Sequence, residues 1–247
     1  MKMLLPDQKL LRKTGAVDYY AWNYSFPINL VEKYRFNKIK NLLGETKYPR
    51  LLEIGMGSGV FLPELSRHCE KLFACDIHDN YGHIAKLLES YNVTNYEVGR
   101  QDIESTDYPD NFFDAIVAVS VLEFVKDIKK ALLEIDRILK PDGVFVTICP
   151  MQNKMLDAVL SLYSKKKPDM EFGDSRQYVS KLLEENFRVL SKGWMLPIIG
   201  KWFPVFTHYK LGKKLRRRAR PKPQSRIVQQ RAILSGVKAR SLSEALH

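Results

Sequence analysis

The sequence predicts an α/β protein built on a doubly wound, mostly parallel β-sheet with helices on both faces. From Arg50 onward, short apolar runs alternate with amphipathic segments, which is the pattern of strand–helix–strand units. The first apolar run leads into a glycine-rich stretch, GMGSG at residues 55–59, of the kind that brings a backbone close to a small ligand. Right-handed crossovers would place the loops after the strands at one edge of the sheet, where such folds bind ligands.

The composition agrees with a globular domain. The chain has 247 residues, of which 45% are hydrophobic and 28% charged, and this suits one α/β domain with additions. No apolar run approaches the roughly 18 residues that a membrane-spanning helix needs. The N-terminal MKMLLPDQKLLRK has too short an apolar core for a signal peptide. The three cysteines show no metal-binding spacing, so no metal site is expected and the cytoplasm is the expected location.

Residues 1–45 predict an N-terminal helical lid that precedes the main domain. The segment contains an aromatic patch, DYYAWNYSFPINL at 18–30, followed by a helix. The apolar face of that helix is expected to be Leu30, Tyr34, Ile39 and Leu42. Two interpretations of the aromatic patch stay open. It covers a bound ligand, with Tyr20 and Tyr24 as candidate substrate contacts, or it packs against the sheet.

Residues 46–209 predict the sheet and its helices. Strands are expected at LLEI (51–54), KLFACDI (71–77), NYEV (95–98), FDAIVAVS (113–120), GVFVTICP (143–150), FRVLSKGWM (187–195) and PVFTHYKL (204–211). Helices are expected at VFLPELSRH (60–68), YGHIAKLLESY (81–91), DIKKALLEIDRIL (127–139), MLDAVLSLY (155–163) and RQYVSKLLEEN (176–186). The fourth of these strands is apolar throughout, as a strand covered on both faces is. Lys140-Pro141-Asp142-Gly143 should close the third helix and Ser175 should cap the last.

The net charge of +12 is concentrated in a C-terminal tail, residues 210–247. Residues 210–240 hold 12 Lys and Arg and no acid, whereas residues 1–209 hold 28 basic and 27 acidic residues. Basic clusters attract phosphate groups, either on nucleic acid or on anionic lipids. The aromatic residues just before the tail favour a membrane surface, whereas the tail lacks the interleaved aromatics of a base-stacking platform. A merely solvated, partly helical tail is the third interpretation.

The glycine stretch excludes one ligand class and favours another. No Lys-Ser or Lys-Thr follows the glycines, so a Walker loop is excluded. A dinucleotide loop needs a small residue where Val60 stands, and Gly59 arrives one position early. Glu53, at the end of the first strand, would repel a pyrophosphate but can hold the amino group of S-adenosylmethionine. Asp76, about 20 residues after Gly55, is placed to accept hydrogen bonds from ribose hydroxyls, which both NAD and S-adenosylmethionine carry.

Four sequence blocks together resemble the class I S-adenosylmethionine-dependent methyltransferases. LLEIGMGSGVF is similar to the first motif of that family and ACDIHDN to the acidic second motif. QDIESTDYPDNFFDAIVAVSVLEFVKD resembles the segment around the fourth strand, and RILKPDGVFVTICP the closing Leu-Lys-Pro-Gly-Gly motif, with Asp142 in place of the first glycine. The blocks follow in order over residues 50–150 and are closest in pattern to type 11, ubiquinone–menaquinone-like methyltransferases. The resemblance implies a seven-stranded, Rossmann-like sheet.

The resemblance also implies a set of residues that bind the methyl donor. The methionine part would be lined by Glu53, Gly55, Met56, Gly57 and Gly59. Asp76 would bind the ribose, with Ile77 against the adenine face. Asp102 would accept from the adenine amino group, and the backbone N–H of Ile103 would meet the ring. Ser120 to Leu122 would border the sulfonium and the acceptor. Taken singly, Asp76 or Asp102 could be a helix cap or a loop acid, Glu53 a structural acceptor, and Cys75 and Cys149 core residues.

The sequence identifies no catalytic base. Methyl transfer is a direct displacement, so a base is needed only for an acceptor that must lose a proton. The family often carries a histidine just after the fourth strand, where this chain has Phe124. Glu123 is a weak candidate base, and a salt-bridged or solvated acid at a helix start is the preferred interpretation. His78 and His83 are expected at the surface.

The acceptor is predicted to be a small apolar or lipid-linked metabolite. If the last two strands pair, the segment between them lies on the ligand edge and offers an apolar rim: Trp194, Ile198, Ile199, Trp202 and Phe203. A buried hairpin cap is the alternative for these residues. Two other functions stay open: an RNA methyltransferase that uses the tail to bind phosphates, and a protein that binds the methyl donor without catalysis. VSVLEF lacks the Asn/Asp-Pro-Pro-aromatic motif of enzymes that methylate base amino groups, which disfavours a nucleic-acid acceptor.

Overall fold

A mixed, seven-stranded sheet forms the framework of the protein in the computed structural model. The structure describes residues 3–15, 18, 20–26, 28–150, 175–195 and 206–214. The strand order is β3-β2-β1-β4-β5-β7-β6. β7 is antiparallel to both of its neighbours, and the other pairings are parallel. The strands are β1 (Tyr48–Ile54), β2 (Cys69–Asp76), β3 (Tyr96–Arg100), β4 (Phe113–Val119), β5 (Leu139–Pro150), β6 (Phe187–Trp194) and β7 (Phe206–Lys213). The predicted doubly wound sheet and its final strand pair are confirmed.

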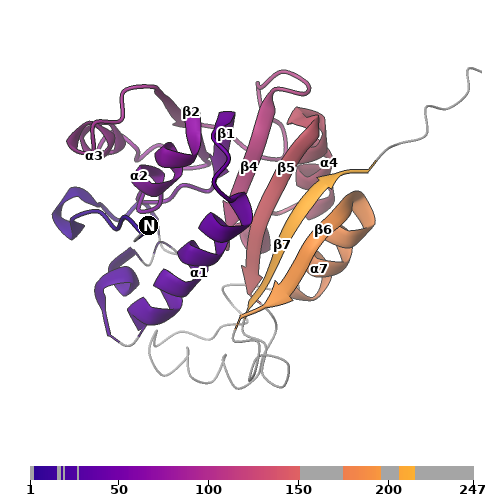
Figure 1. The fold of residues 1–247 in the computed structure, drawn as a ribbon, viewed down its shortest axis with the longest axis horizontal. Helices are drawn as coiled ribbons and strands as arrows, with labels where there is room; N and C mark the ends of the chain where they lie inside the picture. Colours follow the sequence, from indigo (N-terminus) through magenta and orange to yellow (C-terminus); the bar gives the residue numbers. More distant parts are fainter. Residues whose placement is uncertain are drawn as a thin grey trace, which may run out of the picture. The chain divides into compact units, whose positions relative to one another are not determined.

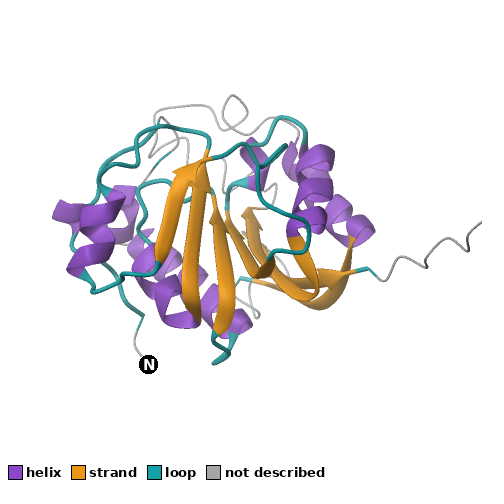
Figure 2. Cartoon of the chain, turned by 90° about the horizontal axis from the view of Figure 1, so that it is seen from above, coloured by secondary structure: helices purple, strands orange, loops and turns teal. Residues whose placement is uncertain are grey.

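Helices cover both faces of this sheet (Figures 1 and 2). The described α-helices are α1 (Ile28–Leu43), α2 (Leu62–Leu65), α3 (Ile84–Ser90), α4 (Ile128–Ile138) and α7 (Ser175–Asn186). Short 3-10 helices lie at η1 (Gln8–Leu10), η2 (Tyr20–Tyr24), η3 (Ser66–His68) and η4 (Leu122–Phe124). One core packs α1, α2 and α3 against the sheet, and a second core packs α4 and α7 against the opposite face. The predicted helix at residues 155–163 lies outside the described residues.

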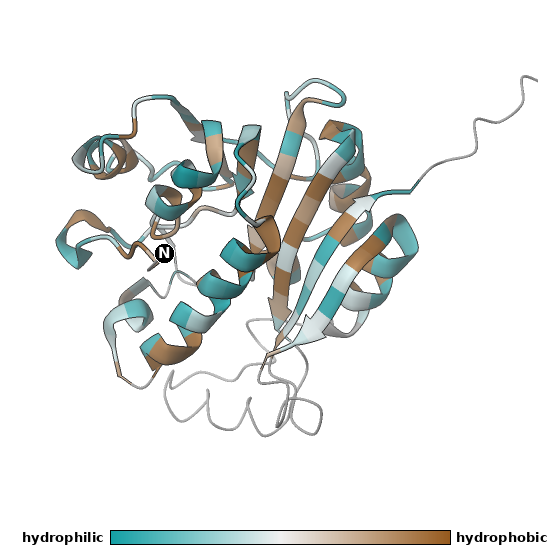
Figure 3. Cartoon of the chain, viewed as in Figure 1, coloured by the Kyte–Doolittle hydropathy of each residue, from teal (hydrophilic) through white to brown (hydrophobic). Residues whose placement is uncertain are grey.

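The two cores explain why the central strands are apolar at almost every position. Successive strand residues point to opposite faces, so Leu51 joins the core beneath α1–α3 and Leu52 the core beneath α4 and α7. The same alternation holds in β4, where Val117 and Ile116 belong to different cores. Figure 3 shows hydrophobic colour along the central strands β4 and β5. A parallel sheet covered on both sides therefore loses the polar–apolar alternation of a half-exposed sheet.

The apolar face predicted for the first helix is partly wrong. The buried side of α1 is formed by Glu32, Phe36, Ile39 and Leu43, whereas Leu30 is 57% exposed. The helix is therefore rotated relative to the predicted face, because a buried Glu32 takes a position that an apolar pattern assigns to solvent. The arginine three residues later neutralises that acid.

Several predicted element ends also differ in the structure. The helix predicted at 127–139 corresponds to α4, which ends at Ile138. The turn predicted at 140–143 lies within β5 instead. Helix α7 is described from Ser175 onward, and the residues before it lie outside the described part of the chain, so capping by Ser175 stays a prediction. β7 continues to Lys213, past the boundary predicted at 209, and the compact unit that contains the sheet runs to Lys214. The rest of the basic tail, from residue 215, lies outside the described residues.

Among the helices that the structure describes, none is both long and apolar enough to cross a membrane. The three cysteines are buried. Burial raises the pKa of the Cys69 thiol to about 12, and burial likewise raises the pKa of Cys75 and of Cys149. A thiol that stays protonated is a poor nucleophile. The expected core role of Cys75 and Cys149 is confirmed.

A charged network ties α4 to the loop before β4. Arg137 donates to both carboxylate oxygens of Glu134 at 2.6 and 2.8 Å and to Asp110 at 2.6 Å. The backbone N–H and the hydroxyl of Thr106 also donate to Glu134, at 2.8 and 2.7 Å. The hydrogen bonds from Arg137, the largest influence, together with those from Thr106, lower the pKa of Glu134 to about 2. The network therefore holds Glu134 ionised in the folded protein.

Replacing Glu134 with Gln is expected to lower the free energy of unfolding near pH 7 by about 1–2 kcal/mol. The folded-state pKa lies below the ordinary value of 4.5, so this stability is present above pH 4.5 and is lost as the pH falls toward 2. Urea denaturation of the wild type and the variant should therefore differ near pH 7 and converge as the pH approaches 2. Glu185→Gln, at a 53% exposed acid on α7, is the control. Equal destabilisation at both pH values would contradict the prediction.

Candidate functional site

The glycine loop after β1 folds over the end of β2. Gly55, Gly57 and Gly59 all have left-handed backbones, with φ of +73°, +50° and +79°. The N–H groups of Gly55 and Met56 donate to the carbonyl of Cys75 at 2.8 and 3.2 Å. The loop is thus held at the carboxyl end of the sheet, the edge predicted for the ligand. Met56 is 3% exposed, so its side chain lies in the core beneath α1–α3.

Two of the three glycines also have no room for a side chain. A Cβ atom at Gly55 would lie 2.3 Å from Cγ2 of Val121, and one at Gly59 would lie 2.4 Å from Cδ1 of Ile84. The loop therefore packs closely against the segment after β4 at Gly55 and against α3 at Gly59. Glycine is therefore required at 55 and 59 both for the backbone conformation and for close packing.

Glu53 places a carboxyl group inside the protein immediately before the loop. The residue is 4% exposed, and among the described residues its buried Oε2 has no hydrogen-bond partner. Burial, followed by the charge of Asp76, raises the pKa of Glu53 well above its usual value. A buried acceptor without a partner is costly unless a ligand completes it. Glu53 is the clearest sign of a binding site in this structure.

Asp76 closes β2 and holds the glycine loop. Its Oδ2 accepts from the N–H of Gly57 at 2.9 Å, and its Oδ1 accepts from the N–H of Ile77 at 2.7 Å. The neighbouring Ile77 side chain is 63% exposed. An acid at the strand end can accept hydrogen bonds from ribose hydroxyls, and the exposed apolar side chain beside it is free to pack against a flat ring. Asp76 thus has a structural role in addition to any ligand contact.

The surface positions predicted for His78 and His83 are not what the structure shows. His83 is 9% exposed and its Nε2 lies 3.1 Å from the carbonyl of Ser58, so it ties the glycine loop to the start of α3. The His78 side chain is 18% exposed, and its Nε2 lies 3.5 Å from Oδ2 of Asp76. Both rings face inward because the loop between β2 and α3 folds back over the glycines.

The loop after β3 brings Asp102 and Ile103 to the same edge with different surroundings. Asp102 is exposed, and its Oδ1 accepts from the N–H of Glu104 at 2.9 Å. Ile103 is 7% exposed and its side chain packs in the core beneath α4 and α7. The predicted contact of Ile103 was through its backbone, so burial of the side chain is compatible with it.

The segment after β4 contains a strained serine. Ser120 has φ of +50°, which is unusual for a residue with a side chain. Its N–H donates to the carbonyl of Ile148 at 2.9 Å, and its Oγ accepts from Nη2 of Arg35 at 2.6 Å. The side chain of Leu122 is fully buried and packs in the core beneath α4 and α7. Glu123 is 3% exposed, so a solvated acid is the wrong interpretation of it.

Arg35, on α1, is a site residue that the sequence analysis missed. Its Nη1 donates to both carboxylate oxygens of Glu32, at 2.8 and 2.7 Å, and its guanidinium lies 4.8 Å from the centre of the Phe206 ring. Its side chain is 11% exposed, and among the described residues its Nε has no hydrogen-bond partner. The spacing of Glu32 and Arg35 along the helix was the available signal. A charged pair buried at the ligand edge fixes α1 over the ends of β4 and β5.

The N-terminal segment crosses the glycine loop. A Cβ atom at Gly57 would lie 3.8 Å from Cγ of Asp18. Asp18 itself accepts hydrogen bonds from the N–H and hydroxyl of Thr14 and from the N–H of Tyr20. The hydroxyl of Tyr24 donates to the carbonyl of Pro6 at 2.5 Å, and burial raises the pKa of that phenol. Tyr20 and Tyr24 also pack against the core beneath α1–α3, as the second interpretation of the aromatic patch expects, whereas Phe26 of the same patch is exposed.

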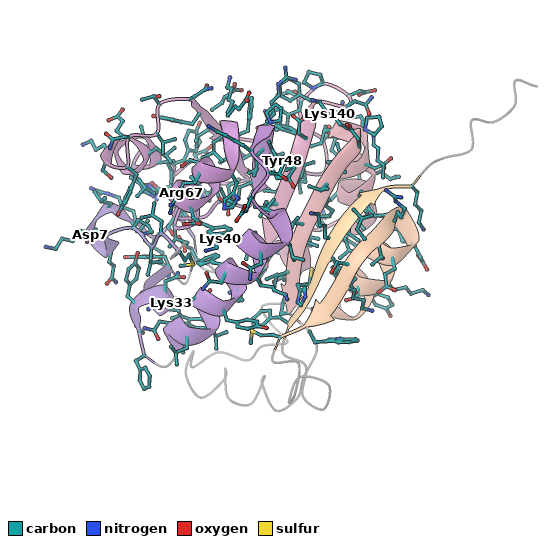
Figure 4. The ribbon with its side chains drawn as sticks, viewed as in Figure 1. Asp7, Lys33, Lys40, Tyr48, Arg67 and Lys140 are labelled. Atoms are coloured by element: carbon teal, nitrogen blue, oxygen red, sulfur yellow. The ribbon has the colours of Figure 1, made fainter. Side chains whose placement is uncertain are left out.

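Three long-range hydrogen bonds hold this segment in place. The N–H of Leu4 donates to Oε2 of Glu64, and the N–H of Asp7 donates to the hydroxyl of Tyr91. The side-chain amide of Asn80 donates to the carbonyl of Lys13. Figure 4 labels Asp7 on this segment and Arg67, which pairs with Glu64. We call the described residues within 3–24 the N-terminal strap.

The predicted apolar rim between the last strands is only partly described. Trp194, at the end of β6, is 43% exposed, and Nζ of Lys192 lies 5.8 Å from its ring centre. Ile198, Ile199, Trp202 and Phe203 lie outside the described residues. The rim stays a prediction.

Comparison with known proteins identifies the family of the central part of the chain. Residues 52–147 match the family model described as a methyltransferase domain. This segment begins within β1, includes the glycine loop, and ends within β5. The match therefore includes Glu53 in β1, Asp76 at the end of β2, and Ser120 just after β4.

Similar proteins carry several activities in their names. The chain is 34% identical over 102 residues to the mitochondrial arginine-hydroxylase NDUFAF5 of Rattus norvegicus, a match that covers 40% of this chain and 28% of that protein. It is 29% identical over 122 residues to the ubiquinone/menaquinone biosynthesis C-methyltransferase UbiE of Teredinibacter turnerae, covering 47% of this chain and 49% of that one. The chain thus spans half or less of the length of these relatives.

A solved structure agrees with the fold over more of the chain. The N-methyltransferase NodS of Bradyrhizobium japonicum, in complex with S-adenosyl-L-homocysteine, superposes with a TM-score of 0.59 at 19% sequence identity. The superposition covers 83% of this chain and 97% of NodS. At this identity the agreement establishes the architecture and leaves the chemistry to the residues of the site.

Proposed function

We infer that this chain, which belongs to the class I S-adenosylmethionine-dependent methyltransferases, binds S-adenosylmethionine beside the glycine loop and transfers its methyl group to an apolar or lipid-linked acceptor. The observation that carries the inference is the buried carboxyl of Glu53, whose Oε2 has no partner among the described residues. An amino group next to the loop would supply the missing hydrogen-bond donor. S-adenosylmethionine provides such a group on its methionine part.

The charge around the loop fits a cationic ligand better than a dinucleotide. Asp18, Glu53 and Asp76 surround the glycines with carboxyl groups. A pyrophosphate at this position would meet like charge, whereas a sulfonium and an ammonium would meet opposite charge. Arg35 on α1, which pairs with Glu32 and bonds to Ser120, has a buried Nε without a partner among the described residues, and that N–H would donate to the carboxylate of the methionine part. The chain's own residues thus match each charged group of the donor.

The ribose and the adenine have a matching surface at the ends of β2 and β3. Asp76 has an acceptor carboxylate at 16% side-chain exposure, and Ile77 presents an uncovered apolar side chain beside it. Asp102 is exposed on the next loop and can accept from an amino group. A nucleoside laid across these three residues would cover Ile77 and satisfy both acids.

When bound, S-adenosylmethionine supplies an electrophilic methyl group that a nucleophile displaces directly. The work of the protein is then alignment and exclusion of water. Ser120 and Arg35 fix the segment after β4, and Asp18 brings the N-terminal strap against the loop. Glu123, buried in η4 next to this edge, is the candidate base for an acceptor that must lose a proton. These residues support a reaction between the glycine loop and α1.

The acceptor is proposed to be apolar, and the protein to work at an anionic membrane surface. Support comes from the half-exposed Trp194 and from the relative named for ubiquinone and menaquinone biosynthesis. The basic tail would strengthen contact with anionic lipids. RNA methylation and donor binding without catalysis are the competing functions. The arginine-hydroxylase among the relatives makes a direct test of methyl transfer necessary.

Calorimetric titration with S-adenosylmethionine, with NAD as the comparison ligand, tests the cofactor. We expect saturable binding of S-adenosylmethionine alone. Asp76→Ala should weaken that binding about tenfold or more, because hydrogen bonds to a charged group contribute about 1.5–3 kcal/mol. Asp79→Ala, at an acid that is 76% exposed and three residues away, is the matched control. Binding of NAD in preference to S-adenosylmethionine would refute the assignment.

Transfer of a labelled methyl group from S-adenosylmethionine then tests the acceptor class. Lipid extract and total RNA are offered separately to the full-length protein. Label in the lipid fraction supports the proposal, whereas label in RNA that depends on residues 215–247 supports the competing enzyme. Donor binding without label in either fraction would favour the non-catalytic alternative.

A further inference from the structure

Two large apolar side chains project from the start of α1 into solvent. Phe26, two residues before the helix, is 81% exposed, and Leu30 is 57% exposed. Phe26 is the most exposed large apolar side chain of the described residues. Leu30 lies on the side of α1 opposite its buried face, and Lys33, which is also exposed, follows three residues later on the same outer side of the helix. We call Phe26, Leu30 and Lys33 the outer stripe.

The position of the outer stripe relates it to the site. Asp18 lies against Gly57 of the glycine loop, and Arg35 bonds to Ser120 at the end of β4. Phe26 and Leu30 fall between these two contacts along the chain. The segment that extends from the donor loop to the acceptor edge therefore carries exposed apolar side chains on its outer side.

The exposed charge of α1 is positive. The helix contains the basic residues Lys33, Arg35, Lys38 and Lys40 and a single acid, Glu32. That acid is buried and paired with Arg35, so the helix offers no acidic group to solvent. Figure 4 labels Lys33 and Lys40 at separate points along α1. The N-terminal end of α1 is thus apolar and is followed by lysines. This arrangement complements a lipid surface, which has an apolar interior and negatively charged head groups.

We propose that the outer stripe docks the protein on an anionic lipid bilayer. Phe26 and Leu30 enter the boundary between head groups and acyl chains, and Lys33 lies among the lipid phosphates. Apolar insertion and electrostatic attraction act together in such binding. The proposal deepens the proposed function, because an acceptor held in the bilayer would meet the protein at the segment that spans Asp18 to Arg35. The docking itself requires neither donor nor turnover.

Co-sedimentation of the full-length protein with vesicles tests the docking. One set of vesicles is phosphatidylcholine alone, and the other contains roughly one third phosphatidylserine to supply negative charge. The wild type is expected to bind the anionic vesicles preferentially. The double variant Phe26→Ser, Leu30→Ser should bind them about tenfold or more weakly, because each change removes an inserting side chain. Leu133→Ser is the matched control, since Leu133 is 52% exposed on α4, on the other face of the sheet.

A second variant reports insertion directly. Phe26→Trp should show a blue shift of its added fluorescence with anionic vesicles and none with phosphatidylcholine. Wild-type-like binding by the double variant, or absence of binding by the wild type, would overturn the proposal. A double variant that also loses affinity for S-adenosylmethionine would overturn it too, since the stripe would then belong to the ligand site. Loss of vesicle binding with unchanged donor affinity supports it and leaves the methyltransferase assignment to its own titration.

Discussion

Replacing Glu53 with Gln is expected to abolish most of the affinity for S-adenosylmethionine and, at the same time, to stabilise the ligand-free protein. The loss of affinity should be about tenfold or more, from the roughly 1.5–3 kcal/mol that a hydrogen bond to a charged group contributes. The gain in stability has the opposite origin. A buried carboxyl with no partner for Oε2 among the described residues opposes folding once it must ionise. The glutamine side chain keeps the shape and removes the charge.

The pH dependence separates the two effects. Burial, with the charge of Asp76 second, raises the folded-state pKa of Glu53 above its usual value of 4.5. The wild type therefore loses stability as the pH rises from 4.5 toward the folded-state pKa, and the Glu53→Gln variant does not. The variant should be more stable by about 1–2 kcal/mol near pH 7 and equal to the wild type near pH 4. Wild-type affinity for the donor should rise with pH over the same range, because binding an ammonium favours the carboxylate.

Urea denaturation and calorimetry at several pH values measure both quantities on the same samples. Glu97→Gln provides the control, because the Glu97 side chain is 58% exposed on β3. A variant that is less stable than the wild type at neutral pH would show that Glu53 is a structural acceptor. Unchanged donor affinity would remove the central support for the proposed site.

Gly55→Ala is expected to destabilise the protein by about 2–5 kcal/mol and to abolish donor binding. Two costs combine. The backbone at 55 has φ of +73°, which opposes any residue with a side chain, and the new methyl would lie 2.3 Å from Cγ2 of Val121. The contact is with a branched side chain fixed beside the loop, so the loop itself must move. Thermal denaturation and donor titration of the variant measure the two consequences.

A second substitution distinguishes the two costs. Val121→Ala should relieve the steric part and leave the backbone part, so the double variant Gly55→Ala, Val121→Ala should recover some stability relative to Gly55→Ala. Gly82→Ala is the control, since a Cβ atom there meets nothing within 4 Å. Additive effects of the two substitutions would mean that the methyl group does not reach Val121.

The strand ends of the candidate site could be predicted because they depend on local pattern. Glu53, Gly55 and Asp76 follow apolar runs, and parallel strands bring their carboxyl ends to one edge whatever the surrounding loops do. The structure adds that Asp76 also holds Gly57. That second role follows from the close approach of two strand ends, which spacing alone does not specify.

The features of the site that the sequence did not predict depend on how segments distant in the chain pack together. Arg35 reaches Ser120 only because α1 lies across the ends of β4 and β5, and Glu32 is buried only because Arg35 neutralises it. His83 turns inward because its loop folds back to the carbonyl of Ser58. An apolar pattern treats each of these polar residues as solvated. Pairing of charges and hydrogen bonding to a remote backbone reverse that expectation.

The N-terminal strap has a consequence for the timing of ligand exchange. It is held on the rest of the protein by hydrogen bonds at Leu4, Asp7 and Lys13 and by packing of side chains such as Leu11 in the core beneath α1–α3. It contributes no strand to the sheet. Such a segment can detach by local unfolding while the sheet stays intact. A donor bound beside the glycine loop and covered by the strap would then leave only as often as the strap opens. The residence time of the donor would then depend on the hydrogen bonds that hold the strap near α2 and α3, at some distance from the atoms that bind the donor.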